Sequence, residues 1–178
     1  MMRVDGWRLG DPVFTADRIA TRVGELAAAI SADYAGDELT VISILKGSYI
    51  FLADLTRALS IPVRVDFLGL SSYVGAESSG EFEWNARMTT SIRDRQVLLI
   101  EDIADTGRTL RHVIDHLAAD EPLSIRVCAF LDKPMRRVVD IPIDYVGFEI
   151  PDHFVVGYGL DYEGWFRQLP HIATLERA

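Results

Sequence analysis

Short apolar runs alternate with helix patterns along this chain, and that alternation restricts the possible folds more than any other feature. Leu39–Leu45 is an apolar, β-branched run of the kind found in strands that are buried on both faces. The other expected strands are Val63–Leu70, Val97–Ile100, Ser124–Leu131 and Ile143–Ile150. The pattern predicts an α/β fold with a mostly parallel central sheet covered by helices on both faces.

Helical spacing of apolar residues fills most of the segments between these strands. Thr15–Ala32 is predicted to be an amphipathic helix with Thr15 as its N-cap. Two further helices are expected at Tyr49–Leu59 and Thr109–Ala119. Ser71–Ala86 shows no clear period and is predicted to be a long loop. Loops of this length in a compact domain are uncommon and often act as lids.

Composition is typical of a soluble protein of one domain, here spanning residues 1–178, with 49% hydrophobic and 25% charged residues. No stretch approaches the ~20 apolar residues of a membrane helix, and the first residues do not form a secretory signal. Cys128 lies in an apolar run, so we expect its thiol to be buried. As the single cysteine it cannot form a disulfide within the chain, which fits a cytoplasmic protein. The net charge of −9 argues against a nucleic-acid partner.

Among 18 basic residues, only Lys46 and Lys133 are lysines. The compact ammonium group of lysine and the planar fork of arginine are not chemically equivalent. The two lysines are therefore candidates for specific contacts, with ordinary surface positions as the alternative.

The segment Val97–Leu110, VLLIEDIADTGRTL, carries the strongest chemical signal. Glu101 and Asp102 follow the apolar strand directly, and Asp105–Thr109 leads into a helix. Loop amides and a helix N-terminus attract anions, and Gly107 allows the backbone to approach a phosphate closely. The two carboxylates suit sugar hydroxyls or Mg²⁺ instead. The segment predicts a ligand with phosphate at one end and hydroxyls or metal at the other.

The same segment has a plainer explanation, in which Asp105 or Thr106 caps the helix and Gly107 eases the turn. The hydroxyls of Thr106 and Thr109 can nevertheless donate to a phosphate. The chain contains neither a Walker motif nor a G-x-G-x-x-G fingerprint. The two acids and two threonines together favour a phosphate site of another kind.

This segment resembles the signature of the type I phosphoribosyltransferases, which bind 5-phosphoribosyl 1-pyrophosphate (PRPP). The resemblance implies that Glu101 and Asp102 hold the ribose. It implies that the 5-phosphate is held by Asp105, Thr106, Gly107, Arg108 and Thr109. It also implies a core over about residues 35–145, with a small hood formed by residues 1–14 and 146–178.

The resemblance to hypoxanthine-guanine phosphoribosyltransferases runs from about Phe14 to Leu175. Its specific pieces are Leu45-Lys46-Gly47, Ser71-Ser72-Tyr73, Glu101–Thr109, Lys133 and Val146–Arg167. It implies purine salvage, in which PRPP and hypoxanthine or guanine give IMP or GMP and pyrophosphate. A homodimer or homotetramer that uses Mg²⁺ is implied as well.

At the pyrophosphate end, the resemblance gives roles to Lys46 and Gly47, which contact pyrophosphate beside a cis peptide bond. A simple turn after the strand is the alternative for this pair. Asp161 is implied to be a magnesium ligand near the base, with Glu101 and Asp102 as further candidates for the metal. Arg167 is equally well explained as a pyrophosphate ligand and as a surface arginine.

At the purine end, the resemblance implies that Lys133 hydrogen-bonds the 6-oxo group. It implies that Phe154 stacks on the base, for which a place in the core is the alternative. Val155 is implied to read the base through its main chain. Asp105 is the implied general acid/base at N7. Ser72 and Tyr73 belong to the implied lid, a mobile loop over Ser71–Ser79 that closes on the reacting centre.

Two other functions are compatible with a PRPP fold. A pyrimidine-responsive regulator that binds RNA would need a basic face, which a net charge of −9 does not favour. Such regulators also usually lack an acid at the position of Asp105. A non-enzymatic sugar-phosphate binding module would not need the acid, the lysines, the aromatic and the metal carboxylate together. The sequence does not rank hypoxanthine, guanine and xanthine as substrates.

Overall fold

The computed structural model describes residues 3–4, 6–72 and 82–177. Its strands are β1 Arg3–Val4, β2 Trp7–Phe14, β3 Leu39–Leu45, β4 Val63–Ser72, β5 Phe82–Ala86, β6 Gln96–Ala104, β7 Ser124–Asp132, β8 Tyr145–Glu149, β9 Val155–Val156 and β10 Ile172–Arg177. Its helices are α1 Ala16–Asp33, α2 Tyr49–Ala58 and α3 Arg108–Ala118, with a 3₁₀ turn, η1, at Pro134–Arg136. Within these described ranges, no helix has the length and apolar character needed to cross a bilayer.

Six strands of the described chain form a central sheet in the order β5-β4-β3-β6-β7-β8. The strands from β4 to β8 run parallel, and β5 pairs antiparallel with β4. Every strand expected from the sequence lies in this sheet, so the predicted α/β fold with a mostly parallel sheet is confirmed. In such sheets ligands bind beyond the carboxyl ends of the strands.

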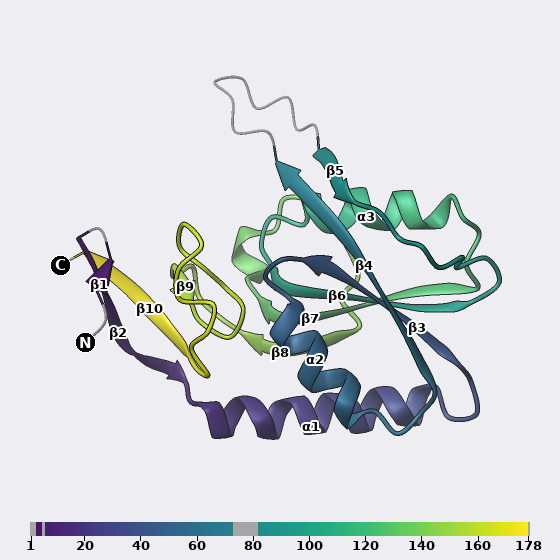
Figure 1. Ribbon diagram of the computed structural model, residues 1–178, viewed down its shortest axis with the longest axis horizontal. Helices are drawn as coiled ribbons and strands as arrows, with labels where there is room; N and C mark the ends of the chain where they lie inside the picture. The colour runs from purple at the N-terminus through teal and green to yellow at the C-terminus, as the bar shows by residue number, and fades with distance from the viewer. Residues whose placement is uncertain (1–2, 5, 73–81, 178) are drawn as a thin grey trace.

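Side chains of the central strands alternate between two apolar layers. Val41 and Leu98 belong to a cluster with residues of α1 and α2, including Phe51. Ile42 and Leu99 belong to a second cluster with residues of α3. The helices therefore cover both faces of the sheet, with α1 and α2 on one side and α3 on the other (Figure 1).

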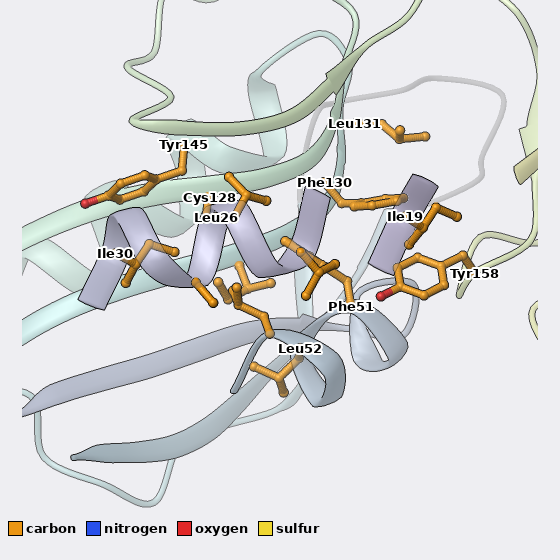
Figure 2. Packing of buried hydrophobic residues seen from close by; sticks show 14 of the residues in the cluster. Ile19, Leu26, Ile30, Phe51, Leu52, Cys128, Phe130, Leu131, Tyr145 and Tyr158 are labelled. Carbon is orange, nitrogen blue, oxygen red and sulfur yellow. The ribbon is translucent and has the colours of Figure 1, made fainter. Parts of the chain in front are cut away.

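The α1 helix begins and packs as its sequence predicts. The Thr15 hydroxyl accepts a hydrogen bond from the Arg18 amide at 3.4 Å, which confirms the expected N-cap. Leu26 and Ile30 are buried on the helix face that looks toward the sheet (Figure 2). In the same layer, Cys128 is fully buried, and burial raises the pKa of its thiol. The predicted buried thiol is confirmed, and it stays in its unreactive protonated form.

A second, antiparallel sheet joins the two ends of the described chain in the order β1-β2-β10-β9. β2 and β10 pair along their length, with Trp7 opposite Arg177 and Phe14 opposite Ile172. On the other edge of β10, Thr174 lies opposite Val155 of β9. This sheet lies to one side of the central sheet (Figure 1). Its strands come from the two stretches in which the resemblance implies a hood, and we refer to it as the hood sheet.

The prediction of one long loop over Ser71–Ala86 is wrong at both of its ends. Ser71 and Ser72 complete β4, and Phe82–Ala86 forms β5 against that strand. The strand is held by pairing and by packing, because the Trp84 ring lies 4.3 Å from the His116 ring of α3. Residues 73–81, with Tyr73 and most of the predicted lid, lie outside the described residues.

Candidate active site

Three cavities of about 240, 70 and 280 Å³ adjoin one another at the carboxyl ends of β3, β6 and β7. They share lining residues, which shows that they are parts of one site. Glu101 and Thr109 line the first two cavities, and Asp105 lines the second and third. Asp102 and Asp161 line both the first and the third.

The loop between β6 and α3 encloses the smallest cavity, of about 70 Å³. Gly107 has a φ of +85°, and a Cβ at this position would lie 2.7 Å from the Val139 carbonyl oxygen. Both facts require glycine here. The Thr106 carbonyl accepts hydrogen bonds from the Val138 and Val139 amides at 3.0 and 3.2 Å, which fixes the loop. The loop, with Asp105 and Thr106 among its lining residues, thus forms a small cup at the N-terminus of α3.

Arg108 differs from its neighbours in this loop. It is the first residue of α3 and is exposed, and it is not among the residues that line the three cavities. Its amide lies 3.5 Å from the Thr106 hydroxyl. Any contribution of Arg108 to phosphate binding would therefore come from its backbone or from a side chain that reorients.

Glu101 and Asp102 form a carboxylate pair at the end of β6. Glu101 is only 8% exposed, and its Oε2 atom has no hydrogen-bond partner among the described residues. Burial raises the pKa of Glu101 well above its usual range, and the adjacent Asp102 carboxylate adds to the effect. A buried, unpartnered carboxylate oxygen is costly unless a ligand supplies a donor or a cation. Sugar hydroxyls and Mg²⁺ are both suitable partners.

The largest group of polar residues lines the cavity of about 240 Å³, where Lys46, Gly47, Asp161 and Arg167 come together. The Leu45–Lys46 peptide bond is cis, as the resemblance implies. A Cβ on Gly47 would lie 1.5 Å from Asp102 Oδ2, so only glycine fits beside that carboxylate. Lys46 and Gly47 nevertheless line the cavity, so part of this turn faces a ligand there.

Asp161 and Arg167 hold each other in the wall of the same cavity. Arg167 Nη2 lies 2.6 Å from Asp161 Oδ1, and its Nη1 donates to the Gly159 carbonyl at 2.6 Å. Asp161 Oδ2 accepts a hydrogen bond from the Gly164 amide at 2.6 Å. Arg167 is thus fixed at the site, which argues against its interpretation as an ordinary surface arginine.

The third cavity, of about 280 Å³, has mixed walls that suit a planar heterocycle. Lys133, Phe154 and Val155 line it together with Asp105. Lys133 is only 7% exposed, so the alternative that it is an ordinary surface lysine is wrong. Phe154 is 56% exposed, so the alternative that its ring belongs to the core is also wrong. In this pocket the buried ammonium group can donate hydrogen bonds to a ligand, and the accessible ring can stack on a planar one.

Magnesium can be accommodated only with the help of a ligand. Glu101, Asp102 and Asp161 line the first cavity, yet no group of three His, Cys, Asp or Glu residues within the described chain is placed to hold one metal ion. Mg²⁺ commonly takes one or two carboxylates and completes its shell with water and substrate phosphate oxygens. The carboxylates fit a metal of that kind.

Comparison with known proteins decides the family. The model of the phosphoribosyl transferase domain matches residues 11–163. The chain belongs to the phosphoribosyltransferase family. It is 43% identical over 160 residues to the hypoxanthine phosphoribosyltransferase of Salmonella typhimurium, an alignment that covers 88% of this chain and 90% of that protein. It is 42% identical to the hypoxanthine-guanine phosphoribosyltransferase of Staphylococcus aureus, with 94% of each chain covered.

Solved structures of phosphoribosyltransferases show the same fold. The hypoxanthine-guanine phosphoribosyltransferase of Bacillus anthracis matches with a TM-score of 0.90 and 38% identity, covering 96% of this chain and 99% of that chain. The hypoxanthine phosphoribosyltransferase of Trypanosoma cruzi, in complex with its product IMP, matches with a TM-score of 0.88 and 38% identity. The match covers 99% of this chain and 98% of that chain. These matches confirm the type I phosphoribosyltransferase fold and the hypoxanthine-guanine branch.

Four charged residues near Asp105 and Lys133 are absent from the sequence predictions: Arg136, Arg137, Asp132 and Asp152. Arg136 Nε donates to Asp105 Oδ1 at 2.9 Å, and Asp152 receives Lys133 Nζ at 3.3 Å. Arg137 donates to the Asp105 carbonyl at 2.8 Å and pairs with Asp132. The adjacent Arg136-Arg137 pair so soon after Lys133 is the only sequence signal for them. Their partners are 16 or more residues away in most cases, which hides the contacts from a local pattern.

Proposed function

We propose that this phosphoribosyltransferase transfers the 5-phosphoribosyl group of PRPP to hypoxanthine or guanine, producing IMP or GMP and pyrophosphate. The observation that carries the proposal is the set of three adjoining cavities, each with the chemistry of one part of the reaction. The relatives from Salmonella typhimurium and Staphylococcus aureus, and the Trypanosoma cruzi structure with IMP, support the choice of a 6-oxopurine.

The smallest cavity takes the 5-phosphate. The amides of Asp105–Thr109 and the N-terminus of α3 supply donors and a favourable dipole for an anion. The hydroxyls of Thr106 and Thr109 add further donors. Glu101 lines both this cavity and the first, and Asp102 lines the first and the third. From these positions the two carboxyl groups accept hydrogen bonds from the ribose hydroxyls.

The first cavity takes the pyrophosphate. The backbone at Lys46 and Gly47 is open to its oxygens, and Lys46 and Arg167 supply positive charge. Asp161, or the pair Glu101 and Asp102, would hold Mg²⁺, which would supply positive charge for the leaving pyrophosphate. Arg167 and Asp161 keep each other in place for this task.

The third cavity takes the base. Phe154 stacks on the ring, Val155 offers main-chain groups, and Lys133 donates to the 6-oxo oxygen. Asp105, which also lines the phosphate cup, accepts the proton of N7 while the bond from the base to C1 of ribose forms. Because Lys133 is purely a donor, a 6-amino group of adenine would find no acceptor there. Ser72 and Tyr73 would close over the reacting centre as part of the lid.

The test is to incubate the purified protein with PRPP, Mg²⁺ and one base at a time, and to quantify nucleotide and pyrophosphate. Hypoxanthine or guanine should give IMP or GMP with one pyrophosphate per nucleotide, and adenine should give no AMP. Xanthine is included because the 2-position is read by main-chain groups. Turnover of uracil with no turnover of a 6-oxopurine would overturn the proposal.

We further propose that the chain acts as one domain, with its core at about residues 35–145 and its hood at both ends, in a cytoplasmic homodimer or homotetramer. The hood sheet, which joins the two ends of the described chain, supports the division into core and hood. A structural study on the Trypanosoma cruzi enzyme concerns the role of its C-terminal region in the oligomeric state. Light scattering on the purified protein would distinguish dimer, tetramer and monomer.

A further inference from the structure

Four charged side chains of alternating sign form a continuous line at the purine cavity. Lys133 Nζ lies 3.3 Å from Asp152 Oδ1, and Asp152 Oδ2 lies 3.2 Å from Arg136 Nη1. Arg136 Nε then lies 2.9 Å from Asp105 Oδ1. The line begins at the group proposed to recognise the 6-oxo oxygen and ends at the group proposed to take the N7 proton.

Only the two ends of this line reach the base. Asp105 and Lys133 are among the residues that line the purine cavity, and the two middle residues, Arg136 and Asp152, are not. The middle residues come from different segments, η1 and the stretch between β8 and β9. Any influence that they have on the base therefore passes through Lys133 and Asp105.

Burial makes the first contact of the line necessary. Lys133 is nearly enclosed, and an ammonium group in that position needs a hydrogen-bonded counter-charge. Asp152 supplies it, and the hydrogen bond from Lys133 followed by the charge of Arg136 lowers the pKa of the Asp152 carboxyl. One bond to Asp152 leaves two of the three ammonium donors for a ligand.

The shape of arginine makes the second contact possible. A guanidinium group presents its donors in a rigid planar fork, which fixes the two acceptors relative to each other. Arg136 uses Nε for Asp105 and Nη1 for Asp152, so it sets the spacing between the two carboxylates. This hydrogen bond uses Oδ1 of Asp105, and Asp105 still lines the purine cavity. Lysine could neutralise the same charges but could not impose this geometry.

We propose that Arg136 and Asp152 are positioning residues that hold Lys133 and Asp105 at a fixed spacing, matched to the 6-oxo oxygen and N7 of the purine. These two atoms are neighbours on one edge of the ring. This inference rests on the proposed function and adds to it two residues that touch neither substrate. It predicts that recognition of the base and transfer of its proton depend on each other.

The experiment measures steady-state kinetics with hypoxanthine and PRPP, together with PRPP binding by calorimetry. Arg136→Gln should lower kcat about tenfold, the order expected when a charge-assisted hydrogen bond is lost. Asp152→Asn should instead raise the KM for hypoxanthine about tenfold, through Lys133. In both variants the affinity for PRPP should stay within about twofold of wild type, and Arg136→Lys should recover only part of the lost kcat.

The control is Arg126→Gln. Arg126 also bridges two groups, Asp33 at 3.0 Å and the Tyr145 hydroxyl at 2.9 Å, but it lies near the start of β7, at the opposite end from Lys133. Its kinetics should match wild type. The double variant R136Q/D152N should lose less than the product of the two single losses, because contacts within one network are not additive.

The outcomes separate this inference from the function on which it rests. A wild-type protein without 6-oxopurine transfer would overturn both. An active wild type with an unchanged kcat in Arg136→Gln, independent losses in the double variant, or full recovery by Arg136→Lys would overturn the positioning role and leave the proposed function intact. Equal losses of PRPP and hypoxanthine affinity would do the same, since they would indicate general damage to the site.

Discussion

Among individual residues, Asp105 lines both the smallest cavity and the third, where the proposed function places the 5-phosphate and the base. Replacing it by Asn keeps the size of the side chain and removes its capacity to take a proton. We expect Asp105→Asn to lower kcat by ~10²–10⁴, the range for loss of a general base. The affinity for PRPP should be largely kept, because the proposed function assigns the 5-phosphate mainly to the loop amides. Single-turnover kinetics and calorimetry measure the two effects separately.

Asp115→Asn is a suitable comparison for that variant. Asp115 lies on α3, within 3.6 Å of Arg111 and away from the three cavities. Removing the charge of Asp115 in this variant should leave turnover unchanged. Undiminished turnover in Asp105→Asn would remove Asp105 from the role of general base.

Gly47 makes a second prediction about a single residue. An added methyl group would overlap the Asp102 carboxylate, with the Cβ only 1.5 Å from Oδ2. Gly47→Ala should therefore displace Asp102 or the turn and raise the KM for PRPP. Gly24→Ala, on the open side of α1 with nothing within 4 Å of its Cβ, is the control. It should stabilise the protein by about 0.5–1 kcal/mol. A Gly47→Ala enzyme with wild-type KM would show that the turn does not bind PRPP.

Among secondary-structure elements, β4 is held to the segment that follows β5 by the side-chain carboxylate of Asp66. Asp66 Oδ2 accepts hydrogen bonds from the Thr89 and Thr90 amides at 2.8 and 2.7 Å, and Oδ1 accepts from the Phe67 amide. Burial alone would raise the pKa of Asp66, but these hydrogen bonds together lower it. The stabilisation is therefore present above the unfolded-state pKa of about 3.9 and is lost as the pH falls through the lower folded-state value.

This gives a pH-dependent prediction for the element. Asp66→Asn keeps one acceptor oxygen of two and should cost about 1.5–3 kcal/mol of unfolding free energy at pH 7, the range for hydrogen bonds to a charged group. The difference from wild type should shrink as the pH is lowered below about 4. Urea denaturation at several pH values measures it. Asp37→Asn, at an exposed position, should show no such trend, and a pH-independent cost at Asp66 would contradict the account.

The central sheet could be predicted from sequence because its strands are buried on both faces and are apolar throughout. β3 was located to the residue in this way. The hood strands could not, because β2 mixes polar and apolar residues and β9 has only two residues. β5 is a similar case, since its place depends on pairing with β4 and on Trp84 packing against α3.

In the candidate site, too, the features carried by one local segment could be predicted and those made by distant segments could not. Glu101–Thr109 is local, so the sequence alone indicates a phosphate loop. The exposure of Phe154 and the burial of Lys133 depend on how the tail folds over β7, and only the three-dimensional arrangement shows them. The contact of Arg136 with Asp105 could not be predicted from a local pattern either, because the two residues are 31 positions apart.

For the whole molecule, the hood and the core share apolar packing. Ile172 of β10 is fully buried in the cluster that also contains Ile19 of α1 and Phe51 of α2. Ile172→Ala should cost about 2–5 kcal/mol, the range for large-to-small changes in a core. Urea denaturation measures this, and Leu123→Ala, at an exposed position, should change stability by no more than about 0.5 kcal/mol. A similarly small cost at Ile172 would mean that the hood is not part of the cooperative unit.

The pairing of β9 with β10 has a consequence for how the protein is made. Residues 46 to 109, which carry most of the proposed sugar-phosphate site, leave the ribosome long before residues 172 to 177. The strand that carries Val155 gains its partner only when those last residues arrive. Within the described chain β9 pairs with β10 alone, so a chain cut short before β10 should lack the pairing that places Val155 in the wall of the third cavity. Under the proposed function, the contacts that read the base are therefore completed last during synthesis.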